Sequence, residues 1–217
     1  MFDLPIVLIK QVSDQPEYEI KDANDQVVGR VVRTEGPPRP RGVRGAIAEA
    51  VSPPPPGRVV IQAAGLDGTP AFSVVSDTGR PLEILDPNGT LIGTLESDQD
   101  ATGAEVRRVA SGSPFGSVLR LIGVGRAMPR EYHLLRDASG RRLCGICWEQ
   151  KQQGHRGGTA WVPTDAEYTD ANGARIARLT YVRATKAEYT LKIEYRLSEP
   201  LRTLVLASPL AFALVRG

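Results

Sequence analysis

Much of the chain alternates apolar and polar residues at the two-residue period of a β-strand. In YTLKIEY (189–195) the odd-numbered residues are aromatic or aliphatic and the even-numbered residues are polar, so each set falls on one face. Further strand-like segments are LPIVLIK, GRVVIQA, AFSVVS, AEVRRVA, SVLRLIGV and TAWVP. Together with the hairpins described next, they predict about a dozen strands.

A second pattern is a repeated strand, turn and strand, found in YEIKDANDQVVGRVV, LEILDPNGTLIGTL, YHLLRDASGRRLCGI and AEYTDANGARIARL. The turns open with Asp22, Asp86, Asp137 and Asp170, and the fourth turn residue is glycine except for Asp25 in the first. An aspartate side chain bonds its own backbone two residues on, and glycine adopts a positive φ at little cost. Each stretch is therefore predicted to be a β-hairpin.

The residues after each turn also agree. A small residue stands four positions beyond the end of each turn, and these residues are Gly29, Gly93, Cys144 and Ala177. A branched apolar residue follows two positions later, and these are Val31, Leu95, Ile146 and Leu179. The aspartates are 64, 51 and 33 residues apart, so there is no fixed period. This argues against a propeller or solenoid and favours an antiparallel barrel or sandwich.

The carboxy-terminal segment LRTLVLASPLAFALV (201–215) is apolar on every side at the helical period. Only 13 residues lie between Arg202 and Arg216, whereas a membrane span needs about 20. The segment therefore predicts a core helix over 199–216, with Ser198 as N-cap and Pro209 kinking the helix or ending its first half. Many strands and one all-apolar helix favour a barrel with the helix threaded through it.

Residues 35–57, EGPPRPRGVRGAIAEAVSPPPPG, interrupt this pattern with seven prolines and four glycines. Proline cannot donate to a central β-ladder, so the segment is predicted to be a surface insertion. Because strands on either side look alike, we interpret residues 1–217 as a single domain that carries this insertion. A linker between two domains is the alternative.

The order of these motifs resembles the tubby-like superfamily, in particular its branch of phospholipid scramblases and LURP-one-related proteins. The stretches that carry the resemblance are FSVVSDTGRPLEILDPNGTLIGTL, YHLLRDASGRRLCGICWE, AEYTDANGARIARLTYV and EPLRTLVLASPLAFALV. The resemblance implies an all-β closed antiparallel barrel of about twelve strands around a central hydrophobic carboxy-terminal helix. It also implies a binding role, because tubby domains hold phosphoinositide headgroups with basic side chains on the barrel wall.

Scramblases of this superfamily carry an acidic calcium motif just before the final helix. The matching stretch here, RATKAEYTLKIEYRLSEP, has the scattered Glu188, Glu194 and Glu199 without such a cluster. The cysteine-rich palmitoylation segment of scramblases is also missing. Calcium-triggered lipid movement is therefore not expected of this chain.

The net charge and the arginine content of the chain limit the classes of binding partner that we expect. The net charge of +2 is nearly balanced and argues against nucleic acid, yet 22 of the 27 basic residues are arginine, which suits phosphate. A biased base composition of the genome is the alternative explanation, because it would enrich arginine equally. Two groupings are candidate sites for anionic phospholipid headgroups or another phosphorylated ligand at the membrane surface: Arg39, Arg41 and Arg44, and Arg136, Arg141 and Arg142. Ion pairing with neighbouring carboxylates is the other interpretation of both.

A different class of function also stays open. The segments GPPRPRG and SPPPPG within residues 35–57 can adopt an extended polyproline form that docks in aromatic grooves. The protein would then be an interaction scaffold that engages a protein partner and has no lipid role.

Catalytic chemistry has little support. The spacing of Cys144 and Cys147 on a strand puts the two thiols on opposite faces, so we expect small buried thiols and no metal or redox centre. His133 is expected in a strand with its polar atoms satisfied, and His155 in a polar loop. No hydrolase elbow, phosphate loop or zinc-protease motif occurs, so neither catalytic residues nor a cofactor are predicted.

The amino-terminal stretch MFDLPIVLIKQ has too few apolar residues for a secretory signal and is interpreted as the first strand. The expected location is the cytoplasm, peripheral to a membrane and without a transmembrane span.

Overall fold

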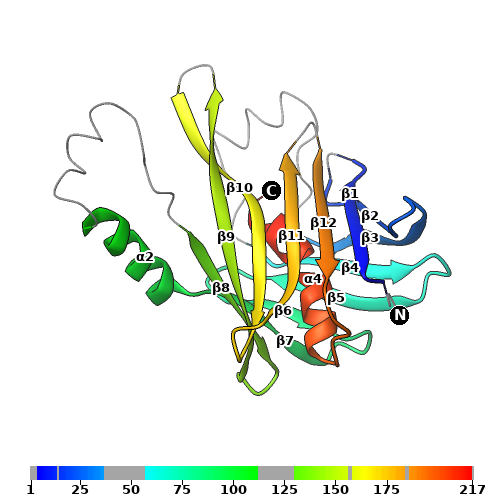
Figure 1. Ribbon diagram of the computed structural model, residues 1–217. Helices are drawn as coiled ribbons and strands as arrows, with labels where there is room; N and C mark the ends of the chain where they lie inside the picture. The colour runs from blue at the N-terminus through cyan, green and yellow to red at the C-terminus, as the bar shows by residue number, and fades with distance from the viewer. Residues whose placement is uncertain are drawn as a thin grey trace.

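The computed structural model describes residues 4–13, 15–36, 57–111, 130–155, 158–183 and 186–216. In these residues, twelve antiparallel strands form a closed barrel (Figure 1). The strands are β1 (Ile6–Gln11), β2 (Tyr18–Lys21), β3 (Val27–Glu35), β4 (Val59–Gly65), β5 (Pro70–Ser76), β6 (Leu82–Leu85), β7 (Leu91–Ser97), β8 (Glu131–Asp137), β9 (Arg142–His155), β10 (Gly158–Asp170), β11 (Arg175–Arg183) and β12 (Ala187–Ile193). The predicted closed barrel is confirmed.

Each strand pairs with the next one along the chain, and β1 closes the barrel by pairing with β12. Successive connections therefore alternate between the two ends of the barrel. One end, the turn end, carries the connections at residues 22–26, 66–69, 86–90, 138–141 and 171–174, and there the chain also leaves β12. Residues 37–56, which connect the neighbouring strands β3 and β4, lie outside the described residues.

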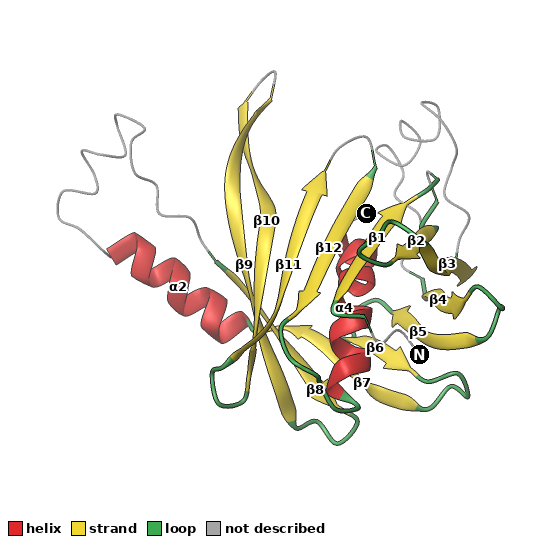
Figure 2. Ribbon diagram, turned by 45° about the vertical axis from the view of Figure 1, so that its right-hand side comes forward, coloured by secondary structure: helices red, strands yellow, loops and turns green. Residues whose placement is uncertain are grey.

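The helix α4 (Leu201–Arg216) runs through the barrel (Figure 2). Every residue from Leu204 to Ala213 is buried, which requires protein on all sides of the helix. Phe212 packs edge-on against Trp148 of β9 at 5.0 Å and against His133 of β8 at 4.9 Å between ring centroids. The apolar segment is therefore a core helix, as predicted.

The start of α4 differs from the prediction. The helix begins at Leu201, and the side chain that caps it belongs to Glu199 instead of Ser198. The Glu199 carboxylate accepts bonds from the Thr203 amide at 3.2 Å and the Thr203 hydroxyl at 2.7 Å. A glutamate reaches the free amides from one residue nearer to the helix, and its charge complements the helix dipole.

Pro209 does not end the first half of α4, because the helix continues to Arg216. A proline removes the N–H that would bond the carbonyl four residues earlier, here that of Val205. The Ser208 hydroxyl donates to that carbonyl at 2.8 Å and so takes over the missing bond.

The four repeated turns form as predicted. In each, one oxygen of the opening aspartate accepts two backbone N–H bonds, from the residues two and four positions later, at 2.8–3.0 Å. The last turn residue has a positive φ, namely Asp25 (62°), Gly89 (83°), Gly140 (84°) and Gly173 (82°). The turn geometry is therefore encoded locally by the aspartate and the residue three positions after it.

A β-bulge follows each of these turns, since the register shifts at the same place in all four hairpins. The residues left without a partner are Val28, Ile92, Leu143 and Ile176, and all four pack in or against the core. The next residue in each strand is the small one of the sequence pattern. Gly93 shows why it is small: a Cβ there would lie 3.0 Å from Leu204 of α4.

One strand prediction is wrong and another is wrong at its end. AEVRRVA belongs to the helix α2 (Gln99–Ser111), which begins where the Asp98 carboxylate accepts the Ala101 amide at 2.9 Å. The Thr102 hydroxyl then accepts the amide of Tyr132 at 3.1 Å, which ties α2 to the start of β8. Tyr195 does not continue the buried face of β12, because the strand ends at Ile193 and Tyr195 is 63% exposed. SVLRLIGV lies outside the described residues.

Candidate functional site

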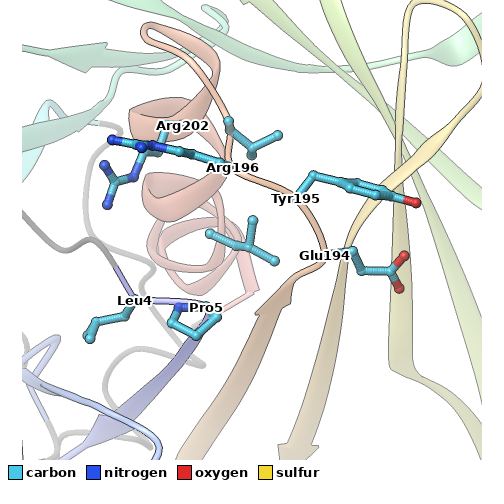
Figure 3. Close-up of a pocket in the computed structure, with 8 residues that line it drawn as sticks. Leu4, Pro5, Glu194, Tyr195, Arg196 and Arg202 are labelled. Carbon is cyan, nitrogen blue, oxygen red and sulfur yellow. The ribbon is translucent and has the colours of Figure 1, made fainter.

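A pocket of about 330 Å³ lies at the turn end, where the chain leaves β12 and enters α4 (Figure 3). Its apolar lining is Leu4, Pro5, Ile193 and Leu197, and its polar lining is Glu194, Tyr195, Arg196 and Arg202. We call this site the basic pocket. It is formed by segments from both ends of the chain, which the β1–β12 pairing brings together.

Backbone bonds hold the walls of the basic pocket in place. The Ile193 amide donates to the Pro5 carbonyl at 2.8 Å, and the Glu194 amide donates to the Ile176 carbonyl at 2.9 Å. Leu4, Ile193 and Leu197 pack against the barrel core, so the apolar side of the pocket is anchored. The chain then turns through 194–200 into α4.

The two arginines of the basic pocket extend to the same side in Figure 3, and Leu4 and Pro5 lie below them in that view. Arg196 is exposed and has neither an ion pair nor a hydrogen bond within the described part of the chain. Arg202, on the first turn of α4, is half-buried. Guanidinium groups arranged in this way attract an anion.

The acidic residue of the basic pocket is already engaged. Glu194 bonds Arg175 of β11 at 2.9 Å, and this contact raises the pKa of the Arg175 guanidinium. In Figure 3 Glu194 and Tyr195 point away from the two arginines. The carboxylate therefore does not neutralise the arginine side of the pocket.

The backbone amides at the start of α4 are also engaged. Arg202 and Leu204 donate to the carbonyls of Ser198 and Pro200, each at 3.1 Å, and Thr203 donates to Glu199. Anion binding here would therefore depend on the two guanidinium groups and not on the helix amides.

The predicted group Arg136, Arg141 and Arg142 lies at the same end, on the β8–β9 hairpin. Arg136 pairs with Glu96 of β7 and donates to the Gly140 carbonyl at 3.0 Å. Arg141 pairs with Asp137 at 3.0 Å. Only Arg142 is exposed without an ion pair among the described residues, so carboxylates already neutralise two of the three guanidinium groups.

The other predicted group, Arg39, Arg41 and Arg44, lies outside the described residues. The strand ends that flank its segment, Glu35 and Val59, are at the end of the barrel opposite the turn end. The structure therefore does not bring these flanking strand ends near the β8–β9 hairpin.

Sequence reasoning missed Arg196 and Arg202. They are six residues apart on either side of a proline, and no periodic pattern links them. The available signal was YRLSEPLR, in which a turn-forming stretch between two arginines leads into the apolar helix. A turn of this kind can return the chain close enough for the two side chains to meet.

The two thiols face different environments, as predicted. Cys144 is fully buried inside the barrel, and burial raises the pKa of its thiol to about 12. Cys147 lies on the outer side of β9 and is only partly buried, which differs from the prediction that both thiols are buried; partial burial also raises its thiol pKa. Neither thiol is a ready nucleophile near neutral pH, because the thiolate is the reactive form.

The remaining candidate polar residues have separate partners. His133 contacts Glu131 at 2.8 Å through Nε2, so its predicted satisfaction is confirmed. The loop position predicted for His155 is wrong, because His155 is the last residue of β9 and pairs with Gly158 of β10; its side chain lies outside the described residues. Glu188 contacts Lys10 at 3.9 Å, away from the partners of Glu194 and Glu199. Over the described residues, no three His, Cys, Asp or Glu side chains gather as a metal site would require.

Comparisons with protein-family models, with curated proteins and with solved structures found no match to this chain. Within the described ranges, each helix is too short or too polar to cross a membrane.

Proposed function

We propose that this protein is a non-enzymatic binding module for anionic phospholipid, which it contacts peripherally at a membrane surface with its turn end. The observation that supports this most is the basic pocket, where Arg196 is exposed and has no partner in the described residues. An arginine fork matches the oxygens of a phosphate, and charge-assisted bonds of this kind are the stronger ones.

The filled barrel supports an external site. Barrels that hold a small ligand in the lumen keep that space open. Here α4 occupies the lumen, and Leu204, Val205 and Leu210 are each 0% exposed. The turn end is therefore a better candidate surface than the interior.

Exposed apolar side chains at the turn end add to the argument. Leu66, in the β4–β5 turn, is 64% exposed, and Tyr195 beside the basic pocket is 63% exposed. Apolar side chains combined with basic ones suit the boundary between lipid headgroups and acyl chains. Each basic residue near an acidic membrane contributes about 1 kcal/mol, so Arg142, Arg196 and Arg202 would give modest, salt-sensitive binding.

Vesicle co-sedimentation tests the proposal. The full chain should sediment with phosphatidylcholine vesicles that contain phosphatidylserine or phosphatidic acid, and less so as salt rises. The Arg196→Ala/Arg202→Ala variant should bind several-fold more weakly, and addition of Arg142→Ala should weaken binding further. The matched control is Arg58→Ala/Arg80→Ala, which removes two exposed arginines at the opposite end. Equal binding to neutral vesicles, or no binding to any vesicle, would refute the proposal.

A further inference from the structure

We infer that the basic pocket binds one phosphate monoester together with the first carbons of an attached alkyl chain, as a single amphiphile. This inference rests on the proposed function for the source of the ligand, and it adds the chemical class and the stoichiometry. It is carried by the size, the charge and the apolar wall of the pocket.

The size of the pocket limits the ligand. Small-molecule sites usually enclose about 300–1,000 Å³, and about 330 Å³ lies at the lower end of that range. A phosphate and a few carbons fit such a volume, whereas two acyl chains do not. The remainder of a lipid would stay outside the pocket, in the bilayer or in solvent.

The charge of the pocket favours a phosphate monoester over a carboxylate. A phosphate monoester carries about −1.5 to −2 charges at neutral pH and presents three strong acceptor oxygens. Two guanidinium groups directed to the same side, those of Arg196 and Arg202, can each present a fork to such a group (Figure 3). A carboxylate has two oxygens and one charge, so it would satisfy only one arginine fully.

Two nearby carboxylates have partners other than Arg196 within the described residues. Glu194 is held by Arg175 at 2.9 Å, and Glu199 accepts bonds from Thr203 at the start of α4. A bound phosphate would therefore give Arg196 an acceptor that it does not have among the described residues.

The apolar wall explains why an alkyl chain should add affinity. Leu4, Ile193 and Leu197 are partly buried against the barrel core, and Pro5 lies beside Leu4. In Figure 3 Leu4 and Pro5 lie below the two arginines, and all four residues line the same pocket. A chain joined to the phosphate would cover this surface, and each buried methylene strengthens binding up to about fourfold.

Calorimetric titration of the full chain with soluble probes tests the inference. We expect n-hexyl phosphate to bind with one site per chain, at least about tenfold more tightly than methyl phosphate, hexanoate or inorganic phosphate. Arg196→Ala/Arg202→Ala should weaken hexyl phosphate binding at least about tenfold, while Arg58→Ala/Arg80→Ala should leave it unchanged. Thermal unfolding of each variant verifies that it is folded.

Each other outcome has a definite meaning. Hexyl phosphate binding that is absent, or equal in the wild type and the Arg196→Ala/Arg202→Ala variant, overturns the inference. If hexyl phosphate does not bind, but the Arg196→Ala/Arg202→Ala variant binds anionic vesicles more weakly than the wild type does, the proposed function stands with a different headgroup chemistry. Binding of hexyl phosphate to the pocket without vesicle binding supports a free phosphate monoester as ligand and removes the membrane proposal.

Discussion

The phenolic oxygen of Tyr168 on β10 lies 2.7 Å from Oγ of Ser208 on α4, and both residues are 0% exposed. Because the single Ser208 proton goes to the Val205 carbonyl, Tyr168 is the donor in this contact. The hydroxyl chain joins the barrel wall to the central helix at the carbonyl that Pro209 cannot serve. It thus accounts for a polar pair within a largely apolar core.

Removing the Ser208 hydroxyl should destabilise the fold. Ser208→Ala takes away the donor to the Val205 carbonyl and the acceptor for Tyr168, so we expect a loss of about 2–3 kcal/mol in the free energy of unfolding. Tyr168→Phe should cost about 1 kcal/mol, because Ser208 keeps its bond to Val205. Urea unfolding measures both, and equal losses for the two variants would contradict this assignment.

A second substitution examines the role of Pro209. In the Ser208→Ala background, Pro209→Ala restores a backbone N–H for the Val205 carbonyl and should recover about 1 kcal/mol. In the wild-type background the same change should recover less, since Ser208 already donates there. No difference between the two backgrounds would show that the hydroxyl does not substitute for the missing N–H.

Gly93→Ala should destabilise the barrel by about 3 kcal/mol. The new Cβ would lie 2.1 Å from the Arg136 carbonyl oxygen and 3.0 Å from Leu204, and the backbone contact leaves little room to adjust. The control is Gly89→Ala, which has a φ of 83° but open space around it and should cost about 1 kcal/mol. Chemical unfolding compares the two, and an equal cost would argue against the clash.

Because Cys144 is buried, the stability of the fold should decrease at alkaline pH. Burial raises the pKa of this thiol from 9.0 to about 12, so above pH 9 the unfolded chain ionises while the folded chain does not. Below pH 9 the ionisation of this thiol therefore does not lower the free energy of unfolding. As pH rises from 9 toward 12, the free energy of unfolding declines by up to about 1.4 kcal/mol per pH unit. Unfolding of Cys144→Ala at pH 8–10.5 should show a shallower decline than wild type, and Cys147→Ala a smaller change. Identical slopes for all three proteins would count against this account.

Protonation of Asp137 should contribute to the loss of stability at acidic pH. Its pKa is held below the ordinary 3.8 by bonds from the Ser139 hydroxyl, from backbone amides and from Arg141. This carboxylate therefore stabilises the fold above pH 3.8, and the stabilisation is lost as pH falls through the lower folded pKa. Asp137→Asn keeps an acceptor in the turn but does not titrate, so its melting temperature should fall less between pH 5 and pH 2. A wild-type acid profile in Asp137→Asn would exclude this carboxylate as a contributor.

The prediction from sequence was accurate where the controlling contacts are local. The Asp170 carboxylate bonds amides two and four residues away, and the alternation in β12 needs only neighbouring positions. The prediction was inaccurate where one or two residues that start or end an element lie in a stretch whose residue types favour a strand. Asp98 starts α2 in a stretch that otherwise has the valines of a strand, and Ile193 ends β12 before Tyr195.

The amino-acid sequence alone therefore determined the strands, the four aspartate turns and the burial of the final helix, because periodicity and turn chemistry act within a few residues. Only the tertiary structure decided which arginines remain available. Arg136 meets Glu96 forty residues away through the β7–β8 register, whereas Arg196 lines the same pocket as Leu4 because the barrel closes between β1 and β12. Charge neutralisation depends on which strands lie side by side, and that arrangement is a property of the whole barrel.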